Sequence, residues 1–210
     1  VRPDVYRPFK DPKLITVAKQ NADFTSVKEA VDSITGSSTT NRYVITVGPG
    51  IFSEGEIDLT TKPYVSIVGS NIQTTLITPS GNTHIVKIGI NNEISFLSFS
   101  GAPSGKAAIY CDDIGDFAQA HKCSFYDCDT NVYVKSDTQD TKFYGEYLDF
   151  NGEYTYGVYC ESISGNLSLA NLENYYNFPT GSNITYCNYA TGSGATVSYT
   201  HLTLPTILLV

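Results

Sequence analysis

Short runs in which apolar and polar residues alternate fill the chain from Tyr43 onward, and Gly, Asn, Asp and Pro separate them. The clearest runs cover residues 43–47, 64–68, 75–78, 85–88 and 94–99. Alternation with a period of two is typical of β-strands with one buried face, and no helical period competes with it here. Strands this short can form either a sandwich or a solenoid, so the choice between them depends on repeats.

Two sets of short motifs recur at nearly constant spacing. In the first set a tyrosine stands between two small or apolar residues: Ile109-Tyr110-Cys111, Val132-Tyr133-Val134, Val158-Tyr159-Cys160 and, more loosely, Thr185-Tyr186-Cys187. The second set pairs two apolar positions: Leu97/Phe99, Cys123/Phe125, Leu148/Phe150 and Ala170/Leu172. Intervals of 22–27 residues are typical of stacked solenoid coils, in which each coil buries its apolar face against its neighbours.

The repeats therefore predict an all-β fold: a right-handed parallel β-helix (solenoid) with a short N-terminal capping α-helix. Because side chains alternate along a strand, Ile109 and Cys111 should point inward while Tyr110 points outward. The equivalent residues of the next two motifs should follow the same pattern. An antiparallel sandwich is the alternative, but it leaves the register of the repeats unexplained.

The N-terminal part is expected to close one end of the stack. Residues 14–18 alternate as a first strand, and Ser26 and Glu29 then fit the capping box of a helix. The apolar residues of this helix share one face: Val27, Ala30, Val31 and Ile34. We expect the helix to cover the apolar end of the solenoid, because a terminal coil lacks a neighbour.

Three segments are expected along the chain. Residues 1–13 contain three prolines and form an extended N-terminal arm, while residues 14–196 form the β-helix domain. Residues 197–206 read Val-Ser-Tyr-Thr-His-Leu-Thr-Leu-Pro-Thr, which resembles the translation of a transposon-type sequencing-library adaptor. We therefore expect 197–210 to be adaptor read-through and the native β-helix to be truncated. The alternative is a natural apolar strand.

Charge and composition narrow the possible partners. The net charge of −8 and the pI near 4.7 argue against nucleic acid, which requires a basic surface. No apolar run is long enough to insert into a membrane, and no signal peptide is visible. The five cysteines lack metal-type spacing, so we interpret them as reduced, buried packing residues and expect neither a metal nor a cofactor.

Several segments of the first half match a known pattern. They are residues 15–19, 23–27, 29–32 and 43–52, a turn from Gly50 to Glu54, and a second coil at 65–69 and 75–77. These segments resemble the opening of pectinesterases, which have the pectin-lyase-like β-helix fold. The strings Val-Gly-Pro-Gly at 47–50 and Lys-Pro-Tyr-Val at 62–65 also resemble β-helix proteins of tailed bacteriophages, which serve as tail fibres, tailspikes or other virion parts.

The pectinesterase resemblance implies a catalytic set that this chain only partly contains. The family uses two aspartates, glutamines that hold the oxyanion, and a late arginine. The glutamine positions fall on Ala107 and Cys128, and no arginine follows Arg42. Each missing oxyanion donor should raise the barrier by about 2.7–4 kcal/mol. If the chain were an enzyme, Asp129 and Asp149 would be its catalytic carboxylates.

These observations favour a non-catalytic virion structural protein or a receptor- or glycan-binding protein. Tyr110, Tyr133 and Tyr159 are the candidates for contact with a glycan or with another subunit. The resemblance to tailspikes implies a homotrimer that meets other virion proteins and a polysaccharide or cell-surface glycan. One alternative is a pectinesterase or polysaccharide lyase acting on pectin-like polysaccharide. A second is a bacterial surface adhesin, which would be secreted or displayed at the cell surface.

Overall fold

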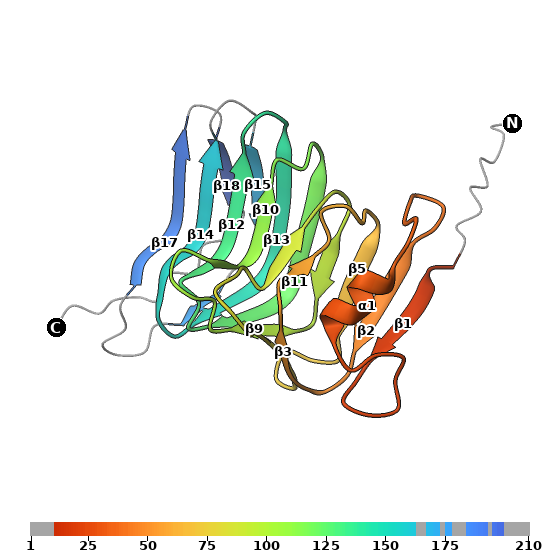
Figure 1. The fold of residues 1–210 in the computed structure, drawn as a ribbon. Coiled ribbons are helices and arrows are strands. Elements are labelled where there is room, and N and C mark those ends of the chain that lie inside the picture. The colour runs from red at the N-terminus through yellow and green to blue at the C-terminus, as the bar shows by residue number, and fades with distance from the viewer. Residues whose placement is uncertain (1–10, 163–166, 173–174, 178–183, 193–194, 200–210) are drawn as a thin grey trace, which may run out of the picture.

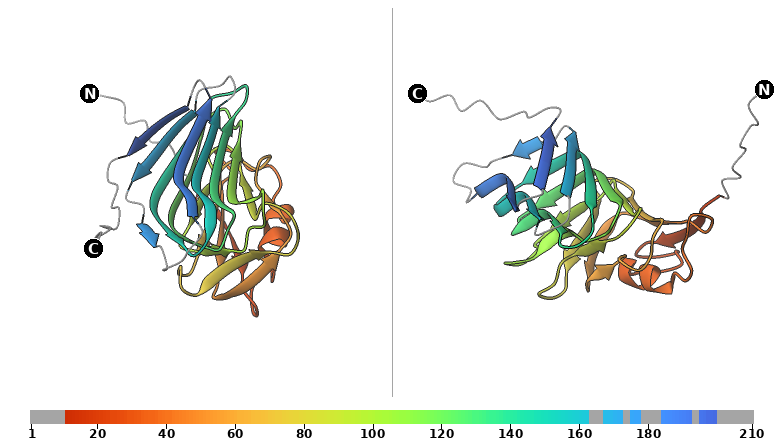
Figure 2. Two further views of the ribbon diagram at one scale, coloured as in Figure 1. Left: turned by 90° about the vertical axis from the view of Figure 1, so that its left-hand side faces the viewer. Right: turned by 90° about the horizontal axis from the view of Figure 1, so that it is seen from above.

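The computed structural model describes residues 11–162, 167–172, 175–177, 184–192 and 195–199. Over these residues the chain forms the predicted right-handed parallel β-helix, with one short helix at its N-terminal end (Figure 1). In the left view of Figure 2, which looks at the C-terminal end, the strands of successive coils lie one behind another. The fold class predicted from the repeats is therefore confirmed.

Each coil contributes strands to three faces. The first face contains β1 (Lys13–Val17), β2 (Tyr43–Val47), β5 (Val65–Gly69), β8 (Glu93–Ser95), the first halves of β11 (Phe117–Tyr126) and β13 (Thr141–Asn151), β15 (Leu167–Leu172) and β18 (Ala195–Tyr199). The second face contains β3 (Gly50–Glu54), β6 (Thr75–Pro79), β9 (Ser98–Ser100), the second halves of β11 and β13, and β16 (Tyr175–Asn177). The third face contains β4 (Ile57–Asp58), β7 (Val86–Ile88), β10 (Ala107–Asp112), β12 (Thr130–Ser136), β14 (Tyr154–Ser162) and β17 (Ile184–Gly192).

A sharp corner separates the first face from the second. Residues 94–99, predicted as one strand, are two strands, β8 and β9, because Phe96 between them has φ 57°. Lys122 and Tyr147 make the same left-handed bend inside β11 and β13, with φ 50° and 51°. Gly69 packs against this corner, where an added Cβ would lie 2.4 Å from the carbonyl oxygen of Phe96. Only glycine allows so close an approach.

The interior follows the predicted alternation. Ile109, Cys111, Val132 and Val134 are fully buried. On the second face, Phe99, Phe125 and Phe150 stack across three coils with ring centroids 5.6 and 5.3 Å apart. The cysteines for which side-chain burial is described (Cys111, Cys123, Cys128 and Cys160) are buried and unbridged. The buried hydrophobic residues form one continuous core cluster, within which similar side chains stack in columns from coil to coil.

The fourth tyrosine motif was placed wrongly. In the parallel register Tyr159 pairs with Tyr189, while Tyr186 pairs with Tyr156. The register position of the tyrosine column is therefore occupied by Tyr189 rather than by Tyr186. Sequence spacing misplaced this motif because the interval between paired tyrosines grows from 23 and 26 residues to 30 residues between Tyr159 and Tyr189.

The last pair of the apolar set was also placed wrongly. Phe150 pairs with Tyr176, not with Leu172, and Ala170 pairs with Tyr144 on the first face. The earlier members are confirmed, because Phe99, Phe125 and Phe150 share one register.

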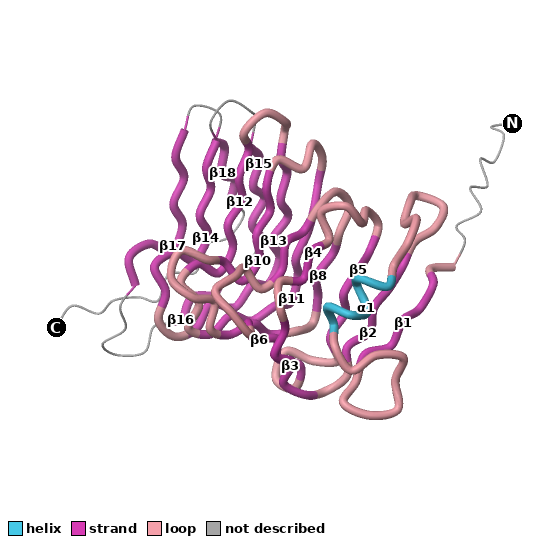
Figure 3. Tube along the Cα trace, in the orientation of Figure 1, coloured by secondary structure: helices cyan, strands magenta, loops and turns pink. Residues whose placement is uncertain are grey.

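Helix α1 (Val27–Ser33) lies beside β1 and β2 and covers the N-terminal end of the solenoid (Figure 3). Ser26 is the N-cap, which confirms one half of the predicted capping box: its hydroxyl accepts a hydrogen bond from the Glu29 amide. The carboxylate of Glu54 also reaches this helix start, accepting from the Val27 amide at 2.8 Å and the Ser26 hydroxyl at 2.6 Å. The turn that ends at Glu54 thus anchors the helix, and a negative charge is favourable there.

The segment boundaries expected from the sequence lie mostly outside the described residues. Of the N-terminal arm, residues 11–13 are described, and Lys13 already belongs to β1. Of residues 197–210, the structure describes 197–199, which form the end of β18. The described helix is too short and too polar to cross a membrane.

Candidate functional sites on the outer surface

The two positions that correspond to oxyanion-holding glutamines are part of the core. Ala107 begins β10, is fully buried and donates its amide to Nδ1 of His84 at 2.9 Å. Cys128 is fully buried, and burial raises the pKa of its thiol to about 12. The thiol contacts the Ala102 amide and the Tyr126 carbonyl. Neither side chain presents a donor to an ester at the surface.

The two candidate carboxylates lie in different parts of the fold. Asp129 sits in the turn before β12 and accepts hydrogen bonds from the Gly105 amide (2.8 Å) and the Thr155 hydroxyl (2.6 Å). Both of its oxygens are therefore used to connect neighbouring coils. Asp149 lies on the second-face half of β13, where the Ser124 hydroxyl donates to it at 3.3 Å. Asp149 is not among the residues that line the pocket around Asp129.

The pocket around Asp129 is small and acidic. It has a volume of about 360 Å³ and is lined by Asp127, Asp129, Glu153, Tyr154 and Thr155. No group of three side chains among the described residues has the geometry of a metal site. Within the pocket, Asp127 accepts a hydrogen bond from the Glu153 amide at 3.0 Å, and Asp129 accepts the two bonds described above.

The candidate tyrosines form a continuous column on the third face. Tyr110, Tyr133 and Tyr159, the tyrosine stripe, are in register on β10, β12 and β14. Their ring centroids lie 5.1 and 4.6 Å apart at interplanar angles of 82° and 52°. His84 stacks on Tyr110 at 4.2 Å, and Tyr156 stacks on Tyr159 at 4.8 Å. Five rings thus contact one another along this face.

Carboxylates beside the stripe accept hydrogen bonds from two of its three tyrosine hydroxyls. Tyr110 donates to Asp112 at 2.8 Å and Tyr133 donates to Glu161 at 2.5 Å. Burial, together with these carboxylates, raises the pKa of both phenols well above the usual range. Both phenols therefore stay neutral, and the three tyrosines of the stripe remain partly exposed to an outside partner.

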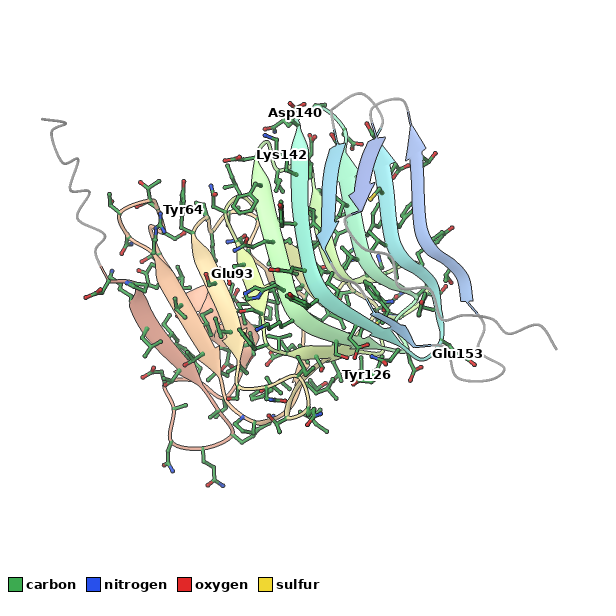
Figure 4. The ribbon with its side chains drawn as sticks, turned by 180° about the vertical axis from the view of Figure 1, so that it is seen from behind. Tyr64, Glu93, Tyr126, Asp140, Lys142 and Glu153 are labelled. Atoms are coloured by element: carbon green, nitrogen blue, oxygen red, sulfur yellow. The ribbon has the colours of Figure 1, made fainter. Side chains whose placement is uncertain are left out.

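A second surface feature was not predicted from the sequence. A pocket of about 480 Å³, the first-face pocket, opens where β1, β2, β5, β8 and β11 begin. Its lining includes the charged residues Asp11, Arg42 and Glu93, together with Tyr64, Ser66, Asn91, Phe117 and Gln119. Figure 4 looks onto this face and labels Tyr64 and Glu93 at β5 and β8. The residues differ from coil to coil, so no repeat marked them; the isolated Arg42 was the one available signal.

Comparisons with known proteins establish the fold. No protein-family profile matches the chain, and no curated protein sequence matches it. Among solved structures, pectin methylesterase PemA from Erwinia chrysanthemi matches with a TM-score of 0.51 and 16% identity, over 76% of this chain and 55% of that protein. A pectin methylesterase mutant solved with a hexasaccharide matches with a TM-score of 0.51 and 14% identity, over 83% and 60%. A Geobacillus virus E2 protein matches with a TM-score of 0.45 and 10% identity, over 79% and 57%.

The chain therefore spans 55–60% of the length of the two pectin methylesterases that it matches. Identities this low carry information on architecture and none on activity. The chain has the pectin-lyase-like parallel β-helix fold that its opening segments resemble.

Proposed function

We propose that this chain is a non-catalytic β-helix that binds a neutral polysaccharide along its third face. The observation that carries the proposal is the tyrosine stripe, an aromatic column bordered by Asp112 and Glu161. Aromatic rings pack against the C–H faces of sugars, and carboxylates accept hydrogen bonds from sugar hydroxyls. A surface that repeats with every coil is suited to a ligand that repeats. The net charge of −8 disfavours a polyanionic polymer.

The non-catalytic part of the proposal is supported by the pectinesterase-like positions. Ala107 and Cys128 lie in the core, and the oxygens of Asp129 are used in hydrogen bonds between coils. The proposed setting is a virion, where such a β-helix would act as a rigid, glycan-binding part of a tail or spike, assembled as a homotrimer with other virion proteins. This setting is supported by the resemblance of residues 47–50 and 62–65 to phage β-helix proteins.

Affinity electrophoresis in gels containing galactan, mannan or polygalacturonate tests binding. A neutral polymer should retard the parent protein, and Tyr133→Ala should weaken the retardation at least about fivefold, as for a central contact residue. Tyr126→Ala is the matched control, since Tyr126 is an exposed tyrosine at the end of β11 on the second face. Equal retardation of the two variants, or no retardation by any neutral polymer, would contradict the proposal.

Two further measurements test whether the chain lacks esterase activity and whether it belongs to a virion. The parent and Asp129→Ala should release equal, background amounts of methanol from methyl-esterified pectin. Release that depends on Asp129 would replace this proposal with an esterase. Long-read sequencing of the source DNA should place the gene among tail or baseplate genes; an export signal and sugar-uptake genes would contradict the virion setting.

A further inference from the structure

The first-face pocket contains an arginine that makes no ion pair with the residues that the structure describes. The Nε of Arg42 donates to the carbonyl oxygen of Thr39 at 3.3 Å, and its guanidinium lies 5.4 Å from the ring centroid of Tyr64. None of the ion pairs found among the described residues involves Arg42. Among the residues that line the pocket, Arg42 is the cation, and Asp11 and Glu93 are the carboxylates.

Hydroxyl-binding groups line the pocket as well. Ser66, Glu93 and Gln119 lie side by side in register on β5, β8 and β11, at positions that point away from the core. The carboxylate of Glu93 is steadied by His121, whose Nε2 lies 2.9 Å from Oε1. A hydroxyl, a carboxylate and an amide in one row offer both donors and acceptors. This is the chemistry that binds vicinal hydroxyls.

The backbone conformation also points to recognition at this pocket. Tyr64 has φ 59° and Asn91 has φ 55°, in the left-handed region that an aromatic residue rarely adopts. The Tyr64 ring supports Arg42, and Phe117 forms an apolar wall. Strained residues that surround a pocket are a reason to look for a ligand there. A volume of about 480 Å³ falls in the range typical of small-molecule sites.

We propose that the first-face pocket binds a single anionic sugar residue. The anionic group, a carboxylate or a sulfate, contacts Arg42, and the sugar hydroxyls contact Ser66, Glu93 and Gln119. The ligand is a single anionic residue rather than a polyanion because Asp11 and Glu93 also line the pocket and the net charge of −8 repels a long polyanion. The site is on a different face from the tyrosine stripe and does not depend on polysaccharide binding there.

Isothermal titration with glucuronate, glucose 6-sulfate and glucose tests this assignment. Both anionic sugars should bind the parent protein, and glucose should bind at least about tenfold more weakly, because a charge-assisted hydrogen bond is lost. The relative affinities of glucuronate and glucose 6-sulfate identify which anion the site prefers. Equal binding of glucose and glucuronate, or no saturable binding of either anion, would overturn the proposal.

Three variants assign the binding to the pocket. Arg42→Gln should weaken glucuronate binding about tenfold or more, and Gln119→Ala should weaken it without changing the charge. Lys142→Gln removes the same charge from an exposed residue on β13, outside the pocket lining (Figure 4), and should have no effect. Thermal unfolding verifies that each variant is folded. If Arg42→Gln and Lys142→Gln weaken glucuronate binding equally, the assignment of the binding site to this pocket is wrong. Tyr133→Ala should leave glucuronate binding unchanged, even if the tyrosine stripe binds no polysaccharide.

Discussion

The first and third faces are built from equivalent strands of the same coils, yet their outer surfaces differ. On the third face tyrosine recurs at one register position, and each ring contacts the next at 4.6–5.1 Å. On the first face the equivalent row reads Val44, Ser66, Glu93, Gln119 and Tyr144. Repeated side chains fill the space between coils, whereas dissimilar ones leave a pocket.

This difference indicates that the outer side chains of the third face stabilise the solenoid, whereas those of the first face are suited to binding a ligand. Contacts between like rings add to stability with every coil, because aromatic pairs stabilise beyond the area that they bury. A row of unlike polar residues adds little to stability, but it places several kinds of donor and acceptor within reach of one ligand. Mutations on the third face should therefore affect stability more than mutations on the first face.

The largest effect is expected inside the solenoid, where repetition and burial coincide. Phe125→Ala removes the middle ring of the stack formed with Phe99 and Phe150. It should lower the free energy of unfolding by about 3–5 kcal/mol, the usual cost of a cavity left by a buried phenylalanine. Chemical denaturation measures this loss. A loss below that of Tyr133→Ala would show that the outer stripe, not the core, dominates stability.

A smaller effect separates the two outer faces. Tyr133→Ala removes two ring pairs and should cost about 1–3 kcal/mol, at about 0.5–1.5 kcal/mol for each pair. Gln119→Ala, at an outer position of the first face, should change the free energy of unfolding by less than about 0.5 kcal/mol. The same denaturation experiment compares them. If both variants lose the same free energy of unfolding, the third face does not stabilise the solenoid more than the first face does.

A further effect depends on pH and concerns the N-terminal end of the stripe. Burial, with a contribution from Lys106, lowers the pKa of His84 to about 4, from an ordinary value of 6.5. The unfolded chain therefore binds a proton more readily, so stability is complete above pH 6.5 and declines as the pH falls toward 4. His84→Gln keeps an acceptor for the Ala107 amide without this titration. Its melting temperature should fall less than that of the parent over this range, and an identical decline would refute the assignment.

Much of the fold could be predicted from the sequence because a parallel solenoid depends on contacts that repeat. The tyrosine and phenylalanine columns revealed the coil length and which residues point inward. The capping box at Ser26 located the helix start. The motifs at 185–187 and 170–172 were placed wrongly because turns vary in length while strand register does not, and spacing cannot show where extra residues lie.

The sequence by itself determined the solenoid, its capping helix and the tyrosine column, since each follows from local alternation or from a motif that recurs. Tertiary structure alone decided that Phe96 is a corner, that Glu54 anchors the helix, and that Arg42, Glu93 and Gln119 line one pocket. These residues come from different coils and share no motif. The lateral stacking of coils brings them together, and that proximity is a property of the folded chain.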